Sequence, residues 1–181
     1  MSDETSFQSN LVRRVQNMAL GPSTPSNALV PVFEAVYNAI HAIQDRFDVE
    51  WFERGRITIS LIDLDQNRPS FEIRDNGIGL DTNNYGSFRT YDSDHKARRG
   101  GKGLGRLSWL KVFDGAKVES VFINDTGCLK RRFILQLDNE QPLADYSLSE
   151  TSGEAGTSVL LFNMKEQYAL NRAGFAGGSN F

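Results

Sequence analysis

Three features are scarce in this sequence: cysteine, long apolar runs, and an excess of charge of one sign. The single cysteine, Cys128, cannot form an internal disulfide or a cysteine-based metal site, which fits a reducing compartment. No apolar stretch approaches the length that crosses a bilayer, and the N-terminal segment MSDETSFQSN lacks the features of a signal peptide. The formal net charge of −3 excludes polyanion binding through overall charge. We therefore expect a soluble, cytoplasmic protein that makes no contact with membranes.

What the sequence does contain is the composition of one ordinary globular domain. Of its 181 residues, 39% are hydrophobic and 24% are charged, which is enough for a substantial core. We expect an N-terminal arm with a short helix over residues 1–27 and the main domain over residues 28–168. Residues 169–181 are rich in glycine, so we expect a disordered tail or a cut in a longer protein there.

The first half of the main domain predicts a long helix followed by a strand hairpin. From Ala28 to Phe47 apolar residues recur at helical spacing, and Ser26 or Asn27 is placed to cap this helix. The segments RITISLIDL and SFEIRD are rich in β-branched residues and flank a turn, which predicts two antiparallel strands. Residues 80–100 are polar and show no sustained period, so we expect a long functional loop there.

The second half predicts one more helix and three strands. The helix runs from about Leu104 to Phe113, and AKVESVFIN and LKRRFILQLD follow it as a strand pair. A polar stretch up to Glu154 leads into the last strand, GTSVLLFNM. Helices and antiparallel strands in this order predict an α+β fold: a two-layer α/β sandwich whose mixed, mostly antiparallel sheet carries helices on one face. A doubly wound nucleotide fold fits less well, because the strands come in hairpins.

The segment RRGGKGLGRLSWL combines four glycines and four cations just before an apolar, helical pattern. Glycine lets the main chain approach a ligand closely. Free N–H groups at a helix start, with Lys102 and Arg106 beside them, form an anion site for which phosphate is the first candidate. Taken alone, the segment fits a flexible surface loop with solvated cations equally well.

Two further segments carry polar residues that a ligand could use. Glu34 and Asn38 lie four residues apart on the predicted long helix and share a face with small alanines, although solvated helix faces often look the same. In EIRDNGIGL, Asp75 ends a strand, and Gly77 and Gly79 follow it. The Asp-Asn-Gly triplet alone is an ordinary turn signal, but two glycines exceed what a turn requires. A carboxylate among small residues accepts a hydrogen bond from an exocyclic amine, and adenine has such an amine.

Four segments together resemble a known superfamily. FEAVYNAIHAI, DNGIG, GGKGLG and GTSVLLF occur in the order and rough spacing of the four sequence boxes of the GHKL superfamily, which includes gyrase, a heat-shock chaperone, histidine kinases and mismatch-repair ATPases. The nucleotide-binding domain of this superfamily is known as the Bergerat fold. The glycine segment, preceded by SDHK, is most similar to bacterial chaperone-type ATPases of the group.

This resemblance implies a role for each matching residue. Glu34 would be the general base for the attacking water, and Asn38 the protein ligand of Mg²⁺. Asp75 would receive the adenine amine, with Thr157 beside it through a water, and the two glycines after Asp75 would shape the base pocket. Residues 80–100 would form a lid. The phosphates would be bound from the lid and glycine segment by Lys96, Gly101, Lys102, Gly103, Leu104 and Gly105.

The function implied by the resemblance is Mg²⁺-dependent hydrolysis of ATP to ADP. ATP would drive lid closure and homodimerisation, and a client protein or DNA would be reached through downstream domains. The isolated domain would turn over slowly, because a charge-stabilising lysine comes from a following domain in several branches. Two alternatives stay open: a histidine-kinase catalytic domain, which uses a close variant of the glycine box, and a nucleotide-sensing module without turnover.

Overall fold

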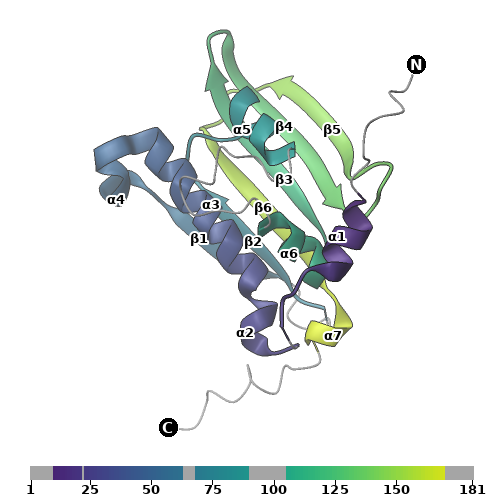
Figure 1. Ribbon diagram of the computed structural model, residues 1–181. Helices are drawn as coiled ribbons and strands as arrows, with labels where there is room; N and C mark the ends of the chain where they lie inside the picture. Colours follow the sequence, from purple (N-terminus) through teal and green to yellow (C-terminus); the bar gives the residue numbers. More distant parts are fainter. Residues whose placement is uncertain (1–9, 22, 63–67, 90–104, 170–181) are drawn as a thin grey trace, which may run out of the picture.

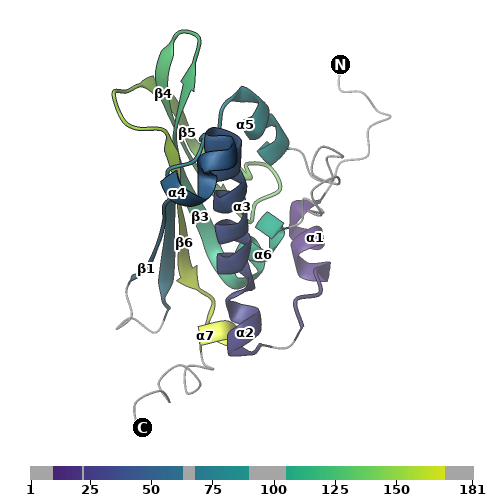
Figure 2. The ribbon, with the colours of Figure 1, turned by 90° about the vertical axis from the view of Figure 1, so that its left-hand side faces the viewer.

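A six-stranded sheet forms one layer of the computed structural model, and helices cover one of its faces (Figures 1 and 2). The structure describes residues 10–21, 23–62, 68–89 and 105–169. The strands lie in the order β1-β2-β6-β3-β4-β5, and each pairing between these strands is antiparallel. The predicted α+β two-layer sandwich is therefore confirmed, with antiparallel pairing throughout the described strands rather than a mixed sheet. The strands are β1 (Ile57–Ile62), β2 (Ser70–Asp75), β3 (Phe113–Asn124), β4 (Gly127–Gln136), β5 (Leu143–Glu150) and β6 (Gly156–Met164).

The predicted long helix is α3, which lies across the covered face of the sheet (Figure 2). Its buried residues, among them Val32, Ala35, Ala39 and Ile43, recur every three or four positions and therefore form one face toward the sheet. The predicted cap is wrong, because a short helix precedes α3 and is capped by the Thr24 hydroxyl, which accepts a hydrogen bond from a main-chain N–H at 3.2 Å. The helices are α1 (Leu11–Asn17), α2 (Pro25–Ala28), α3 (Val30–Phe47), η1 (Asp48–Glu50), α4 (Trp51–Arg54), α5 (Thr82–Arg89), α6 (Gly105–Val112) and α7 (Glu166–Ala169).

The loop expected over residues 80–100 is partly helical. Helix α5 begins after Asp81, whose Oδ1 accepts a hydrogen bond from the main-chain N–H of Asn84 at 2.7 Å and so caps the helix. Its Tyr85 and Phe88 pack on Phe133 of β4, with ring centroids 5.6 and 5.1 Å apart. Tertiary packing therefore stabilises a helix whose polar sequence shows little helical signal. Residues 90–100 lie outside the described residues.

The polar stretch expected before the last strand also contains a regular element. Strand β5 pairs with β4 along Leu143–Glu150 and forms an edge of the sheet (Figure 1). Most of its side chains are exposed, so the strand needs few apolar residues and carries no clear alternation. Main-chain pairing with β4, rather than burial of side chains, holds this strand in the fold.

Two rows of apolar side chains fill the space between the central strands and the helices. One row crosses four strands through the paired residues Phe71, Leu161, Ala116 and Leu135, and its neighbour crosses the same strands through Ile73, Val159, Val118 and Phe133. These residues are buried or pack against the buried core, together with residues of α3 and α6. A sheet with one covered face places such residues at every second position of each strand.

Candidate functional site

The next row on the covered face is polar. Asp75 pairs with Thr157, Thr157 with Ser120, and Ser120 with Arg131, so four adjacent strands each contribute one polar side chain. We call these four residues the polar row. Directly paired side chains on one face lie within reach of each other. Inward positions of the strands usually carry apolar residues, but here Ser120 and Arg131 are polar and buried. Such buried polar side chains need hydrogen-bond partners, which distinguishes this row from the apolar core.

Asp75 is a buried carboxyl group at the end of β2. Its Oδ1 accepts a hydrogen bond from the main-chain N–H of Gly77 at 2.7 Å. Burial raises the pKa of Asp75 to about 6, although main-chain hydrogen bonds from Gly77 and Thr157 and the charge of Arg46 lower it. The carboxyl group is therefore ionised at neutral pH in a poorly solvated place, where a donor group of a ligand binds strongly.

Arg46, in the last turn of α3, joins the three elements around Asp75. Its Nη1 donates hydrogen bonds to the carbonyl oxygens of Asn76 and Ala155, both at 2.7 Å. Asn76 follows Asp75 in the chain, and Ala155 lies two residues before Thr157. One guanidinium group thus holds together the ends of the two strands that carry Asp75 and Thr157, and attaches both to α3.

The two glycines after Asp75 are needed by the packing of the protein itself. A Cβ on Gly77 would lie 2.6 Å from the Cβ of Ala42 on α3. Gly79 has φ +80° and lies so close to β3 that a Cβ would overlap the carbonyl oxygen of Val121. These close approaches place the turn after Asp75 against Ala42, one helical turn beyond Asn38. The predicted role of the glycines in shaping a base pocket stays a prediction.

Glu34 and Asn38 lie on the side of α3 that connects the polar row to helix α6. The Glu34 carboxylate is so close to Gly105 that a Cβ there would overlap Oε2 of Glu34. Gly105 is the first residue of α6, so this carboxylate lies at the positive end of a helix. Asn38, half-buried, lies one turn further along the same side, between Glu34 and Ala42. The structure therefore brings Glu34, Asn38 and the turn after Asp75 into one continuous stripe.

Part of the predicted phosphate site lies outside the described residues. This holds for Lys96, Gly101, Lys102, Gly103 and Leu104, and for residues 90–100 of the expected lid. The structure does show that α6 begins at Gly105, which confirms the prediction of a helix directly after the glycine segment.

Three residues of the site were missed by sequence reasoning: Ser120, Arg131 and Arg46. Arg131 donates hydrogen bonds to the carbonyl oxygens of Leu80 and Asp81, the second at 3.0 Å, and its guanidinium lies 4.1 Å from the ring centroid of Tyr85. A signal for Ser120 and Arg131 was present, because each interrupts an apolar period-two pattern at an inward position of its strand. Arg46 gave no such signal, since a cation in the last turn of a helix is common.

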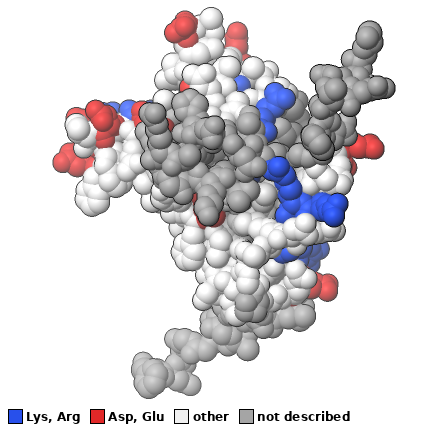
Figure 3. Space-filling view, viewed as in Figure 1, with Lys and Arg blue, Asp and Glu red and all other residues white. Residues whose placement is uncertain are grey.

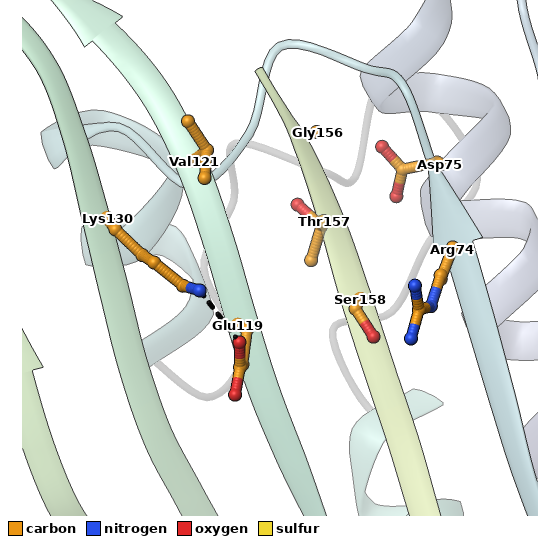
Figure 4. Close-up of a pocket in the computed structure, with 8 residues that line it drawn as sticks. All are labelled: Arg74, Asp75, Glu119, Val121, Lys130, Gly156, Thr157 and Ser158. Carbon is orange, nitrogen blue, oxygen red and sulfur yellow. Dashed lines mark ion pairs between the residues drawn. The ribbon is translucent and has the colours of Figure 1, made fainter. Parts of the chain in front are cut away.

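A shallow cavity of about 210 Å³ lies at the same strand ends (Figure 4). Four of its lining residues, Arg74, Glu119, Lys130 and Ser158, alternate with the polar row and so belong to the uncovered face of the sheet. Glu119 pairs there with Lys130 at 3.0 Å, shown dashed in Figure 4, and with Lys117 at 3.3 Å. Asp75 and Thr157 of the polar row line the cavity as well, together with Val121 and Gly156, so it lies around the strand ends that carry this row.

Two further observations concern possible metal ligands and the charged side chains on the surface. Within residues 10–21, 23–62, 68–89 and 105–169, no group of three or more His, Cys, Asp and Glu could hold a metal ion. A cation held by one amide oxygen and by ligand phosphates needs no such group, so Asn38 remains suitable for Mg²⁺. On the face in Figure 3 Lys and Arg gather mainly over the part that includes α1, and acidic side chains lie in several places toward the edges of the view.

No helix in the described part of the chain is both long and apolar enough to cross a membrane.

Comparisons with known proteins add a likeness in fold. No protein-family model matches the chain, and no curated protein matches it. Among solved structures, it is similar to the ATPase region of Saccharomyces cerevisiae topoisomerase II, crystallised with ICRF-187 (dexrazoxane), at 14% identity and a TM-score of 0.63. The match covers 93% of this chain and 53% of that chain, so this chain spans about half the length of the matched one. The likeness is one of fold, and it agrees with the predicted two-layer α+β sandwich.

Proposed function

We propose that this chain is an adenine-nucleotide-binding module that hydrolyses ATP with the help of Mg²⁺. The observation that supports this most is the continuous stripe of Glu34, Asn38 and Ala42, which leads from the start of α6 to the turn after Asp75. A nucleotide has the matching sequence of groups, a base at one end and a triphosphate at the other. The likeness in fold to a topoisomerase ATPase region agrees with this reading.

In this proposal the base binds at the polar row. The Asp75 carboxylate accepts a hydrogen bond from the exocyclic amine of adenine, and Thr157, its paired neighbour, lies beside it. The pair is held in place by Arg46, which bonds to the main chain next to both strands. A guanine base would present its carbonyl oxygen to the carboxylate and be repelled.

The phosphates bind at the other end of the stripe. The main-chain N–H groups of Gly101, Gly103, Leu104 and Gly105, with the charges of Lys96 and Lys102, would surround them, as at other helix starts that bind anions. Asn38 would hold Mg²⁺, which supplies neutralisation of phosphate charge. Glu34, one turn before Asn38, orients the attacking water and accepts its proton.

The remaining parts of the proposal concern conformational change, dimerisation and contacts made by other domains. We propose that residues 80–100 close over bound ATP, that closure favours a homodimer, and that downstream domains contact a client protein or DNA. The similarity of the SDHK and GGKGLG segments to chaperone-type ATPases belongs to this proposal as well. Groups that stabilise charge in phosphoryl transfer, such as arginine fingers, change rates by about 10³ to 10⁵. If such a group comes from elsewhere, the isolated module turns over slowly.

The test combines binding with product analysis. Calorimetry with ADP and with a non-hydrolysable ATP analogue, with Mg²⁺ or with EDTA, measures affinity, and radiolabelled ATP reveals the products. Released phosphate supports a hydrolase, label on a histidine of a second protein supports a kinase, and binding without either supports a sensor. Glu34→Ala should abolish phosphate release and leave ADP affinity within about twofold, whereas Glu53→Ala, an exposed glutamate of α4, should change neither. Absence of nucleotide binding would refute the proposal.

A further inference from the structure

Most of the exposed large apolar side chains gather on one side of the fold. Of the nine found among the described residues, six lie between positions 33 and 61: Phe33, Tyr37, Val49, Phe52, Ile59 and Leu61. They belong to α3, to the two short helices after it and to the edge strand β1. This side of the molecule faces the viewer in Figure 2. Single exposed apolar residues are common, but a group of them marks an interaction surface.

Strand β1 contributes the part of this surface that belongs to the sheet. Ile59 and Leu61 lie on the covered face, because they pair with Ile73 and Phe71, two residues of the core rows. They are nevertheless 53% and 48% exposed. The covered face therefore ends at β1 in apolar side chains that remain in contact with solvent.

Helix α3 continues the same surface. Its sheet-facing residues separate two flanks, and Glu34 and Asn38 lie on the flank toward α6. Phe33 and Tyr37 lie on the other flank, which faces β1, because β1 and α6 are on opposite sides of α3 in the strand order. Their side chains are 63% and 45% exposed. We call the four residues Phe33, Tyr37, Ile59 and Leu61 the β1 flank.

The main chain of β1 offers hydrogen-bonding groups along the same edge. The carbonyl oxygen of Arg56 accepts the N–H of Asn76 at 3.3 Å, so the main-chain groups of Arg56 point toward β2. These groups point to alternate sides along a strand, so those of Ile57, Ile59 and Leu61 point away from β2. Within the described residues β1 pairs with β2 alone. An outward row of N–H and C=O groups therefore accompanies the exposed apolar side chains.

The opposite edge of the sheet is protected against further pairing, whereas β1 is not. Strand β5 carries the charges of Asp145 and Glu150, and its pairing with β4 is irregular between Arg132 and Ile134. Charges and bulges are usual means by which an edge strand avoids pairing with another chain. Strand β1, of sequence ITISLI, has no charge and no proline, and its pairing with β2 is regular. The edge at β1 is therefore open to a further strand.

We propose that β1 pairs antiparallel with β1 of a second copy of this chain, centred on Ile59, and so forms a homodimer with one continuous sheet. In this register Ile59 lies opposite Ile59 of the partner subunit, and Ile57 lies opposite Leu61 of the partner subunit. Their main-chain groups face each other, and each such pair exchanges two hydrogen bonds, so the edge forms about six. The flank of α3 toward α6 stays uncovered, so this dimer goes beyond the proposed function and needs no nucleotide.

The sequence of β1 favours a second copy over an unrelated strand. In this register apolar side chains meet on the covered face, and Thr58 meets Ser60 of the partner subunit on the other face. The two-fold axis places α3 of both copies on the same side of the sheet, so Phe33 and Tyr37 of each copy flank the paired strands. Pairing of the two β1 edges leaves the protected β5 edges outermost, so association closes at two copies.

The area of the β1 flank agrees with an interface of ordinary size. The exposed fractions of its four side chains add up to about two whole side chains, or roughly 400 Å² at about 200 Å² each. A standard interface buries about 800 Å² on each partner, of which a little over half is apolar. The main-chain edge and the polar side chains of β1 supply the remainder.

Sedimentation velocity of the chain without nucleotide, at concentrations up to about 100 µM, measures the association. A species of twice the monomer mass of 20.3 kDa should increase with concentration. Ile59→Lys should raise the dimer dissociation constant at least about tenfold, because two like charges then oppose each other at the axis. The matched control is Ile123→Lys, since Ile123 is a more exposed isoleucine, at 67%, on the inner strand β3. This control should keep the wild-type dissociation constant within about twofold.

Cysteine cross-linking tests the register, in a Cys128→Ser background and with a short bismaleimide. Ile59→Cys should cross-link fastest, because the two copies of this position meet at the axis. The two copies of Leu61→Cys lie four residues apart along the paired strands, about 14 Å, and should cross-link more slowly. An equal mixture of Ile57→Cys and Leu61→Cys should again react fast, since these two positions lie opposite each other.

Each outcome supports or overturns the proposal. A chain that stays monomeric at about 100 µM overturns it and leaves the edge to an extended segment of another protein. A dimer that Ile59→Lys leaves intact overturns it, and so does a dimer that appears only with an ATP analogue, which would instead fit the nucleotide-driven homodimer of the proposed function. If Ile59→Lys does not fold, the cross-linking decides, and equal rates for Ile59→Cys and Leu61→Cys overturn the proposal.

Discussion

Replacing Asp75 with asparagine should make the protein less sensitive to pH and unable to bind adenine nucleotides. Burial raises the pKa of Asp75 from its ordinary value of 3.8 to about 6 in the folded chain. Between these values the folded protein binds a proton that the unfolded chain has lost, so stability falls as the pH rises through this window. The stabilising effect of the neutral carboxyl group is complete below pH 3.8 and is lost as the pH passes about 6.

The size of this effect follows from the shift. A difference between 3.8 and about 6 corresponds to about 3 kcal/mol of unfolding free energy, using about 1.36 kcal/mol per pKa unit. Asparagine does not ionise, and its side-chain oxygen can still accept the hydrogen bond from Gly77. The wild-type chain should therefore lose about 2.4 kcal/mol more than Asp75→Asn between about pH 4 and about pH 7.5, which is most of this effect.

Urea unfolding at the two pH values measures this difference, because effects common to both chains cancel. Asp125→Asn, which removes an exposed carboxylate in the turn between β3 and β4, is the control and should follow the wild type. Equal pH dependence of the wild type and Asp75→Asn would refute the reasoning. Binding should change in parallel: ADP affinity of the wild type should fall by up to about tenfold per pH unit below pH 6, and Asp75→Asn should lose at least about a hundredfold in affinity.

Three further predictions concern other parts of the site. Arg46→Gln should weaken ADP binding by about tenfold, because it removes two hydrogen bonds that hold the strand ends, whereas Arg54→Gln, in an exposed ion pair, should not; calorimetry of both variants decides. Asn38→Ala should reduce the gain in ATP affinity that Mg²⁺ provides, and an equal gain in variant and wild type would contradict the assignment. Gly79→Ala should destabilise the chain by about 2 kcal/mol or more in urea unfolding, whereas Gly86→Ala, in open space on α5, should change stability by less than about 1 kcal/mol.

The fold could be predicted from the sequence wherever the spacing of apolar side chains determines the helix or strand. The long α3, the hairpin of β1 and β2 and the helix after the glycine segment all follow from apolar spacing, and the structure contains each of them. The spacing of apolar residues did not predict two elements that are stabilised mainly by other interactions. Strand β5 is held mainly by main-chain pairing, and α5 by the packing of two aromatic rings on β4, so neither has a strong local pattern.

At the site, the sequence predicted residues whose side chains could bind a ligand, such as Asp75. It did not predict the residues that fix their positions through hydrogen bonds. Asp75 and Thr157 lie 82 positions apart in the chain, yet they are direct partners across β2 and β6. Their pairing was implied only by the resemblance, because register between distant strands depends on the whole sheet. Arg46, Ser120 and Arg131 act through contacts to main-chain atoms of other segments, and such contacts leave no spacing rule in a sequence.

The bonds to Leu80 make the polar row and helix α5 a single cooperative unit. The Leu80 N–H donates a hydrogen bond to Ser120, and Arg131 donates one to the Leu80 carbonyl oxygen. Both main-chain groups of Leu80 are therefore bonded to the polar row. Any local opening that lifts α5 off the sheet must break these bonds and leave a hydroxyl and a guanidinium buried without them. A ligand that orders Thr157 and Ser120 therefore raises the free energy of that opening. Amide protons of α5 should accordingly exchange more slowly when an adenine nucleotide is bound.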